Sequence, residues 1–248
     1  MKTISGFTFI HNAIESGYPI VEAIRAVQPY TDEIVVVDMQ STDNTREVLE
    51  KLDVKIINGF WGNQAGETLR RAHNQYRQCS RDTIIHFEAD EVYDPELLEN
   101  IIHLLRQGVQ DIAVYRLQLE QNFQRCRWYP EPVHRVFPRL SHVRKEGHTT
   151  NQQEKATVLG PENGYLWDIT NCFRDNWLNR VKKQAELRGE KPQYIMTPIH
   201  STLPANVSEQ DAQQWLYGGR HWEWTNTPFN IPEILKSLVG MVKYEPEI

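Results

Sequence analysis

Residues 33–45 read EIVVVDMQSTDNT, and they give the clearest indication of the fold class. The apolar run at residues 34–37 has no alternating polar side chains, which is typical of a parallel strand covered by helices on both faces. The run stops at Asp38, and the small polar residues 41–43 are of the kind that cap a following helix. The stretch therefore predicts a buried strand, a loop that carries a carboxylate, and then a helix.

The same alternation of strand and helix continues on both sides of this stretch. Further short apolar runs typical of strands occupy residues 3–10, 54–57, 82–87 and 111–119. Apolar spacing and opening prolines predict helices over 19–27, 41–52, 64–79 and 95–105. This order predicts an α/β protein with a mostly parallel central sheet flanked by helices and joined by right-handed crossovers.

A second predicted strand also ends in acids, because the run TIIHF at residues 83–87 is followed by Glu88, Asp90 and Glu91. Ligands of parallel sheets bind beyond the carboxyl ends of the strands, where Asp38 is also expected. Three acids in four residues repel one another unless a cation neutralises them. Carboxylates suit Mn²⁺ or Mg²⁺, which bind through one or two carboxylates plus substrate phosphates. An acidic turn before a helix is the structural alternative for this tetrad.

The composition excludes several classes of protein. The chain has 248 residues, of which 40% are hydrophobic and 24% charged, and this argues against disorder and a collagen-like structure. A net charge of −6 argues against a nucleic-acid partner. Three widely spaced cysteines predict reduced thiols. Without a signal peptide or an apolar run of membrane-spanning length, the sequence predicts a cytoplasmic protein, with peripheral contact to the inner face of a membrane as an option.

Taken together, the two acid-bearing motifs resemble those of family 2 glycosyltransferases. Residues 34–45 are similar to the family signature VVDDGSTDxT, and FEADE at residues 87–91 is similar to the LDADE form of its DxD motif. The order of the two motifs and their separation of about 50 residues also match. Met39 and Gln40 stand where the family usually has Asp and Gly. The resemblance covers about residues 3–150.

This resemblance implies a GT-A fold and an enzyme that moves a sugar, with inversion, from a nucleotide-sugar donor to a hydroxyl acceptor. We expect a nucleotide-sugar-binding and catalytic core over residues 1–150. Residues 151–248 are expected to form a helical and loop extension that completes the acceptor side of a single unit. By the same resemblance the donor is a UDP- or GDP-sugar. The acceptor is a saccharide or a lipid-linked molecule, as in the synthesis of cell-surface glycans or lipopolysaccharide.

The resemblance also assigns roles to individual residues. The residues that it places around the nucleotide-sugar are His11, Asn12, Asp38, Asn74, Glu88 and Asp90. Of these, Asp38 would contact the nucleobase, and Asp90 would bind the metal ion, Mn²⁺ or Mg²⁺, together with the diphosphate. The acceptor hydroxyl needs a base on the opposite face of the sugar. The stretch EGHT at residues 146–149 is similar to a family element that ends in HE, so Glu146 and His148 are the candidates.

Two other functions stay open at this point. A nucleotidyltransferase of related fold would want a glycine-rich, basic loop after the first strand, and residues 11–15 read HNAIE instead. A catalytically inactive protein that binds nucleotides or carbohydrates on the same fold is the other alternative, because the acid pair that supplies the base in many family members is absent. The apolar stripe at residues 231–242 could pack on the core or lie on a membrane.

Overall fold

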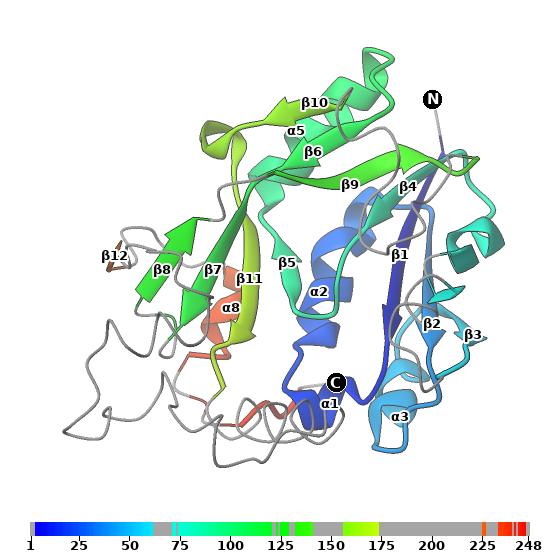
Figure 1. The fold of residues 1–248 in the computed structure, drawn as a ribbon, viewed down its shortest axis with the longest axis vertical. Helices are drawn as coiled ribbons and strands as arrows, with labels where there is room; N and C mark the ends of the chain where they lie inside the picture. Colours follow the sequence, from blue (N-terminus) through cyan, green and yellow to red (C-terminus); the bar gives the residue numbers. More distant parts are fainter. Residues whose placement is uncertain are drawn as a thin grey trace.

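The computed structural model describes residues 3–61, 71–72, 74–120, 123, 125–128, 132–140, 156–173, 225–226, 233–239, 241 and 243–246. Within these residues the chain forms two sheets with helices packed against them (Figure 1). Glu146 and His148 lie outside the described residues.

The first sheet has seven strands among the described residues. In spatial order they are β10 (Thr157–Leu159), β6 (Ile112–Val114), β9 (Val133–Pro138), β4 (Thr83–His86), β1 (Ile4–Ile10), β2 (Glu33–Asp38) and β3 (Lys55–Asn58). β4, β1, β2 and β3 are all parallel, while β9 is antiparallel to β4 and to β6. The prediction of an α/β fold with a largely parallel central sheet is confirmed.

Strand β2 is buried on both faces, as its continuous apolar sequence predicts. Val35 and Val37 belong to one apolar cluster, whereas Ile34 and Val36 belong to the other. Successive side chains of a strand point to opposite faces, so the two pairs pack on opposite faces of the sheet. All four side chains are at most 3% exposed. Burying each one stabilises the fold by about 1.5–3 kcal/mol.

The second sheet runs β12 (Thr225–Asn226), β8 (Arg125–Trp128), β7 (Arg116–Glu120), β11 (Leu166–Asn171) and β5 (Glu91–Tyr93). It shows that the single strand expected at residues 111–119 is wrong. The segment divides at Tyr115: β6 joins the first sheet and β7 the second (Figure 1). A strand that passes from one sheet to another makes a corner between them. The apolar run at residues 112–115 passes directly into the alternating residues 116–120, and no glycine or proline marks the corner between them.

The helices lie largely where the sequence predicts them. They are α1 (Ala13–Ser16), α2 (Ile20–Val27), η1 (Gln28–Tyr30), α3 (Thr45–Leu49), η2 (Gln75–Gln78), α5 (Pro95–Arg106), η4 (Pro161–Asn163) and α8 (Glu233–Lys236). Helix α5 starts at Pro95, and the Asp94 side chain caps it by accepting a hydrogen bond from the Glu96 N–H at 3.0 Å. The expected helix over 64–79 is described only from residue 71 onward.

The C-terminal stripe contributes to the core in its described part. Helix α8 is shorter than the helix expected over 231–242, and turn residues follow it. Leu235 and Leu238 are buried, and the buried Tyr244 donates a hydrogen bond to Glu22 of α2 at 2.8 Å. Core packing therefore accounts for these apolar residues. No helix among the described residues combines the length and the apolar character that a bilayer crossing requires.

Candidate functional site

The loops after β1 and β2 are joined by hydrogen bonds centred on Asn12. Its side-chain oxygen accepts from the Thr42 N–H at 2.7 Å, and its backbone N–H donates to the Ser41 hydroxyl at 3.0 Å. Asn12 adopts the left-handed conformation, with φ of 49°, which asparagine tolerates better than most residues. Asn12 therefore holds two loops together. It lies at the edge where it was predicted, with its amide engaged by Thr42.

Asp38 ends strand β2, and the residue is 4% exposed. One oxygen accepts a hydrogen bond from the Ser41 N–H at 2.9 Å, and the other lies 3.4 Å from Nη1 of Arg46. The same Arg46 nitrogen donates to the Asn58 side chain at 2.9 Å. The carboxylate is thus oriented by its own loop and by a cation on α3.

Gln40 occupies the glycine position of the signature and has a φ of 60°. This is the left-handed region, where glycine is favoured because it has no Cβ. The neighbouring Met39 is 1% exposed and packs closely against Gly59, where an added Cβ would lie 2.4 Å from the Met39 sulfur. The backbone of the signature is therefore kept in this chain although two of its residues differ.

The ring of His11 is stacked on the ring of Trp61, with centroids 3.9 Å apart and planes 13° apart. His11 Nδ1 lies 2.8 Å from the Met39 carbonyl oxygen, which can only accept, so Nδ1 carries the proton. Trp61 is 41% exposed. Sequence reasoning missed Trp61 as the partner of His11. The stack covers one face of each ring, so the exposed part of Trp61 is the aromatic surface that remains beside Asp38's loop.

A cavity of 330 Å³ opens beside the ends of β2 and β3. Its lining includes Met39, Gly59, Arg71 and Asn74, so the structure brings Asn74 next to the signature loop. The guanidinium carbon of Arg71 lies 5.2 Å from the ring centroid of Phe60, a cation–π contact. The volume lies within the range of small-molecule sites. This cavity suits one part of a ligand, such as a base or a ribose.

The acid turn, residues 88–91, follows β4 at the same edge of the sheet and contains a buried ion pair. Glu91 is 0% exposed, and Arg135 of β9 is 1% exposed. Arg135 donates to Glu91 through Nε at 2.9 Å and through Nη2 at 2.6 Å, and the same Nη2 reaches Glu88 at 2.9 Å. The cation that neutralises this turn is thus, in large part, an arginine of the chain, which sequence reasoning did not identify.

A second arginine extends this ion pair into the second sheet. Nη1 of Arg116, on β7, lies 3.4 Å from Glu91 and 3.9 Å from the buried Asp168 of β11. Burial alone would lower the pKa of Arg135, but the Glu91 and Glu88 carboxylates outweigh this and raise that pKa above its ordinary value. Arg135 is therefore a permanent positive charge beneath the turn.

The remaining acid of the turn, Asp90, is partly buried. Its backbone carbonyl accepts a hydrogen bond from the Ile169 N–H at 2.9 Å. Among the described residues, no three His, Cys, Asp or Glu side chains gather closely enough to hold a metal ion by themselves. The hard carboxylate oxygens nevertheless fit Mn²⁺ or Mg²⁺ when substrate phosphates supply the other ligands.

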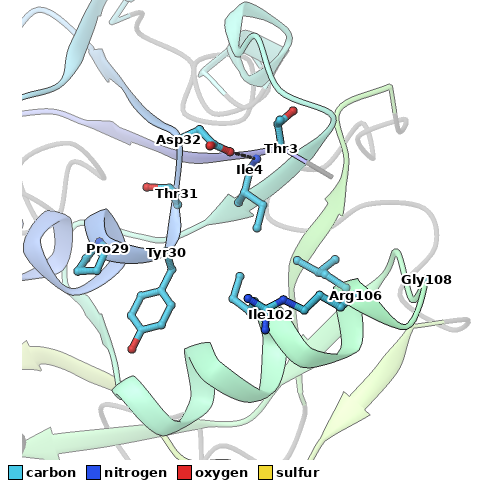
Figure 2. Close-up of a pocket in the computed structure, with 10 residues that line it drawn as sticks. Thr3, Ile4, Pro29, Tyr30, Thr31, Asp32, Ile102, Arg106 and Gly108 are labelled. Atoms are coloured by element: carbon cyan, nitrogen blue, oxygen red, sulfur yellow. Dashed lines mark hydrogen bonds between the residues drawn. The ribbon is translucent and has the colours of Figure 1, made fainter. Parts of the chain in front are cut away.

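Most of the predicted binding residues lie at the carboxyl ends of adjacent parallel strands: His11 and Asn12 follow β1, Asp38 ends β2, and Glu88 and Asp90 follow β4 (Figure 1). Another cavity, of 610 Å³, lies at the opposite edge, where Thr3, Asp32 and Arg106 line it (Figure 2). It contains none of the predicted residues.

Comparisons with known proteins agree with this arrangement. An uncharacterized glycosyltransferase of Rickettsia prowazekii is 32% identical over 120 residues, which are 48% of this chain and 39% of the relative. One from Rickettsia conorii is 30% identical over 103 residues, 40% of this chain and 34% of the relative. This chain thus spans less than half of the length of these curated relatives.

Among solved structures, S. aureus TarS 1–349 in complex with UDP has a TM-score of 0.50 and 13% identity. The match covers 88% of this chain and 70% of that one, and it shows a shared GT-A fold. The model of glycosyl transferase family 2 matches residues 9–182, more than two thirds of the chain. The chain therefore belongs to glycosyl transferase family 2.

Proposed function

We propose that this chain transfers a sugar from a nucleotide-sugar donor to a hydroxyl acceptor. The observation that carries the proposal is the shared edge at which β1, β2 and β4 present the His11 loop, Asp38 and the acid turn. A flat aromatic surface, a cavity and a carboxylate suit a nucleoside, while an acid turn at the end of β4 suits a metal-bound diphosphate.

The nucleoside half of the donor would bind at the signature loop. The stacked rings of His11 and Trp61 supply an aromatic surface, and Asp38 supplies an oriented acceptor for a base N–H. The cavity that Met39 and Asn74 line adjoins this loop. That S. aureus TarS was solved with UDP supports a uridine nucleotide as the first donor to test.

The diphosphate half would lie at the acid turn. Asp90 would hold Mn²⁺ or Mg²⁺ together with diphosphate oxygens, and Glu88 would adjoin the sugar or the diphosphate. When bound, the ion offsets the negative charge that grows on the departing diphosphate. Arg135 keeps the turn from repelling an anionic ligand, because it neutralises part of the charge of Glu88 and Glu91.

The transfer itself breaks the bond between the anomeric carbon and the diphosphate oxygen and forms a bond to the acceptor oxygen. The acceptor's proton goes to a base, and Glu146 and His148 are the two proposed candidates. The bonding pair leaves with the nucleoside diphosphate. Attack from the opposite face inverts the anomeric centre, which NMR of the product can check.

The test is a panel of UDP- and GDP-sugars incubated with the protein and Mn²⁺, read as release of nucleoside diphosphate. We expect one donor to be hydrolysed and Asp90→Asn to abolish the release, while the exposed Asp53→Asn variant retains it as a matched control. Binding without turnover across donors and acceptors would instead favour the catalytically inactive binding protein. Neither binding nor turnover with any nucleotide would contradict the proposal.

A further inference from the structure

The acid turn is held by a guanidinium group that reaches it from another strand. Arg135 belongs to β9 of the first sheet, and Glu91 begins β5 of the second. Two guanidinium nitrogens of Arg135 bind the two oxygens of Glu91, and one of them also binds Glu88. One side chain therefore ties together both ends of the turn in which Asp90 lies.

The backbone of the turn is tied at the same places. The Glu91 N–H donates to the Glu88 carbonyl at 3.0 Å, and the Glu88 N–H donates to a carboxylate oxygen of Glu91 at 3.1 Å. On the other side, the Ile169 N–H holds the Asp90 carbonyl at 2.9 Å. The position of Asp90 thus depends on where Glu88 and Glu91 are held, and Arg135 holds both.

A buried ion pair is an expensive way to stabilise a fold, since desolvating two charges offsets much of their attraction. Apolar side chains of similar volume would fill the space between the sheets as well. An arginine differs from them by its planar fork, which binds carboxylates with two parallel hydrogen bonds and a fixed direction. The ion pair therefore contributes mainly by fixing the positions of the Glu88 and Glu91 carboxylates at the turn.

We propose that Arg135 is a positioning residue that sets Asp90 for the metal-bound diphosphate of the donor. This inference rests on the proposed function. The guanidinium group of Arg135 fixes Glu88 and Glu91 on the two sides of the turn. The positive charge of Arg135 also lowers the repulsion between the turn and an approaching diphosphate. Arg135 acts through Glu88 and Glu91, so its loss should weaken metal and nucleotide binding in a chain that stays folded.

The test compares Arg135→Lys with Arg81→Lys. Lysine keeps the charge of Arg135 but has no fork to span Glu88 and Glu91. Arg81 precedes β4, at the end of that strand away from the acid turn, and receives the same substitution as the control. Free Mn²⁺ is followed by electron paramagnetic resonance while protein and UDP are titrated. Hydrogen exchange at the Ile169 and Glu91 amides reports the order of the turn without any ligand.

For Arg135→Lys we expect Mn²⁺ and UDP binding to weaken by about tenfold or more, as is typical when a residue that orients a metal ligand is lost. The Ile169 and Glu91 amides should exchange faster, and KM for the donor should rise. Arg81→Lys should match the unchanged protein in all three measurements. Unaltered binding and exchange in a folded Arg135→Lys protein would overturn the inference.

A second variant separates positioning from folding. Replacing both members of the pair, Arg135→Met with Glu91→Met, removes the buried charges together and is expected to fold. If Arg135 positions Asp90, this folded variant also loses Mn²⁺ and UDP binding; binding equal to that of the unchanged protein would show that Arg135 only compensates Glu91. If the unchanged protein itself does not bind Mn²⁺ and UDP or GDP, the proposed function fails, and this inference fails with it.

Discussion

Two loops at the same edge of the sheet are held in place by different forces. The signature loop after β2 is held mainly by hydrogen bonds to Asn12, whose partner Thr42 lies 30 residues further along the chain. The acid turn after β4 is held by ion pairs to Arg135, 44 residues beyond Glu91. In the first loop the hydrogen bonds join two short motifs, whereas the second loop depends on the charge of Arg135, which belongs to no motif. A motif that is visible in the sequence can thus depend on a residue that the sequence does not single out.

The largest expected loss of stability comes from removing the ion pair that holds the acid turn. Arg135→Met leaves the buried Glu91 with only the more distant Arg116, at 3.4 Å, as a cationic partner. Removing one member of a buried pair costs about 3–5 kcal/mol of unfolding free energy. Urea denaturation followed by circular dichroism measures it. The double variant Arg135→Met with Glu91→Met should recover most of the loss. A decrease of less than about 1 kcal/mol in the single variant, near the value of an exposed pair, would show that the turn does not depend on this charge.

The pH should act on the charged region as well, through His134, which precedes Arg135 on β9. Burial, with a smaller contribution from Arg135, lowers the pKa of His134 to about 4. The unfolded chain, with an ordinary histidine pKa of about 6.5, binds the proton first as the pH falls. The contribution of the neutral His134 to the free energy of unfolding is therefore fully present above pH 6.5. It decreases toward pH 4 by up to about 3 kcal/mol.

The Asp111 carboxylate, 3.3 Å from His134 Nε2, opposes this decline because it favours the protonated ring. Urea denaturation at pH 7.0 and pH 4.5 measures the loss. His134→Gln serves as the reference, since it removes the titrating group and should flatten the difference between the two pH values. Equal losses in both proteins would assign the pH dependence to other groups.

Removing the hydrogen bonds that hold the signature loop should lower the stability by a smaller amount. Asn12→Ala removes the acceptor of the Thr42 N–H and puts a Cβ-bearing residue without a polar side chain at φ 49°. We expect a loss of about 1–2 kcal/mol by thermal or urea unfolding. Asn12→Gly loses the same hydrogen bond but tolerates the backbone, so it should lose less. If glycine and alanine destabilise equally, the left-handed conformation contributes nothing.

The smallest expected change in stability comes from Gln40, whose backbone is left-handed in the signature loop. Gln40→Gly relieves a left-handed φ of 60° but gives the unfolded chain more freedom, so the stability should change by less than about 1 kcal/mol, in the favourable direction. Differential scanning calorimetry can resolve the shift against Gln40→Ala, which keeps the strain. A lower melting temperature for the glycine variant would indicate that the side-chain contact of Gln40 with the Trp61 N–H outweighs the strain.

Several parts of the fold could be predicted because their signals are local. The apolar run before Asp38 predicted β2 with its two buried faces, and Pro95 predicted the start of α5. Other parts could not be predicted from local signals. The division at Tyr115 between two sheets is not marked by a glycine or a proline. Arg135 is one of several basic residues between 116 and 148, and nothing in its neighbourhood distinguishes the one that becomes buried.

The amino-acid sequence was enough to predict the alternation of strands and helices, the family resemblance, and the sheet edge at which Asp38 and Asp90 lie. These depend on periodicity and on short motifs, which act within a few residues of the chain. Only the tertiary structure decided that His11 stacks on Trp61 and that Arg135 neutralises Glu88 and Glu91. Stacking and ion pairing act through space between distant strands and loops, and burial strengthens them only after the sheets have come together.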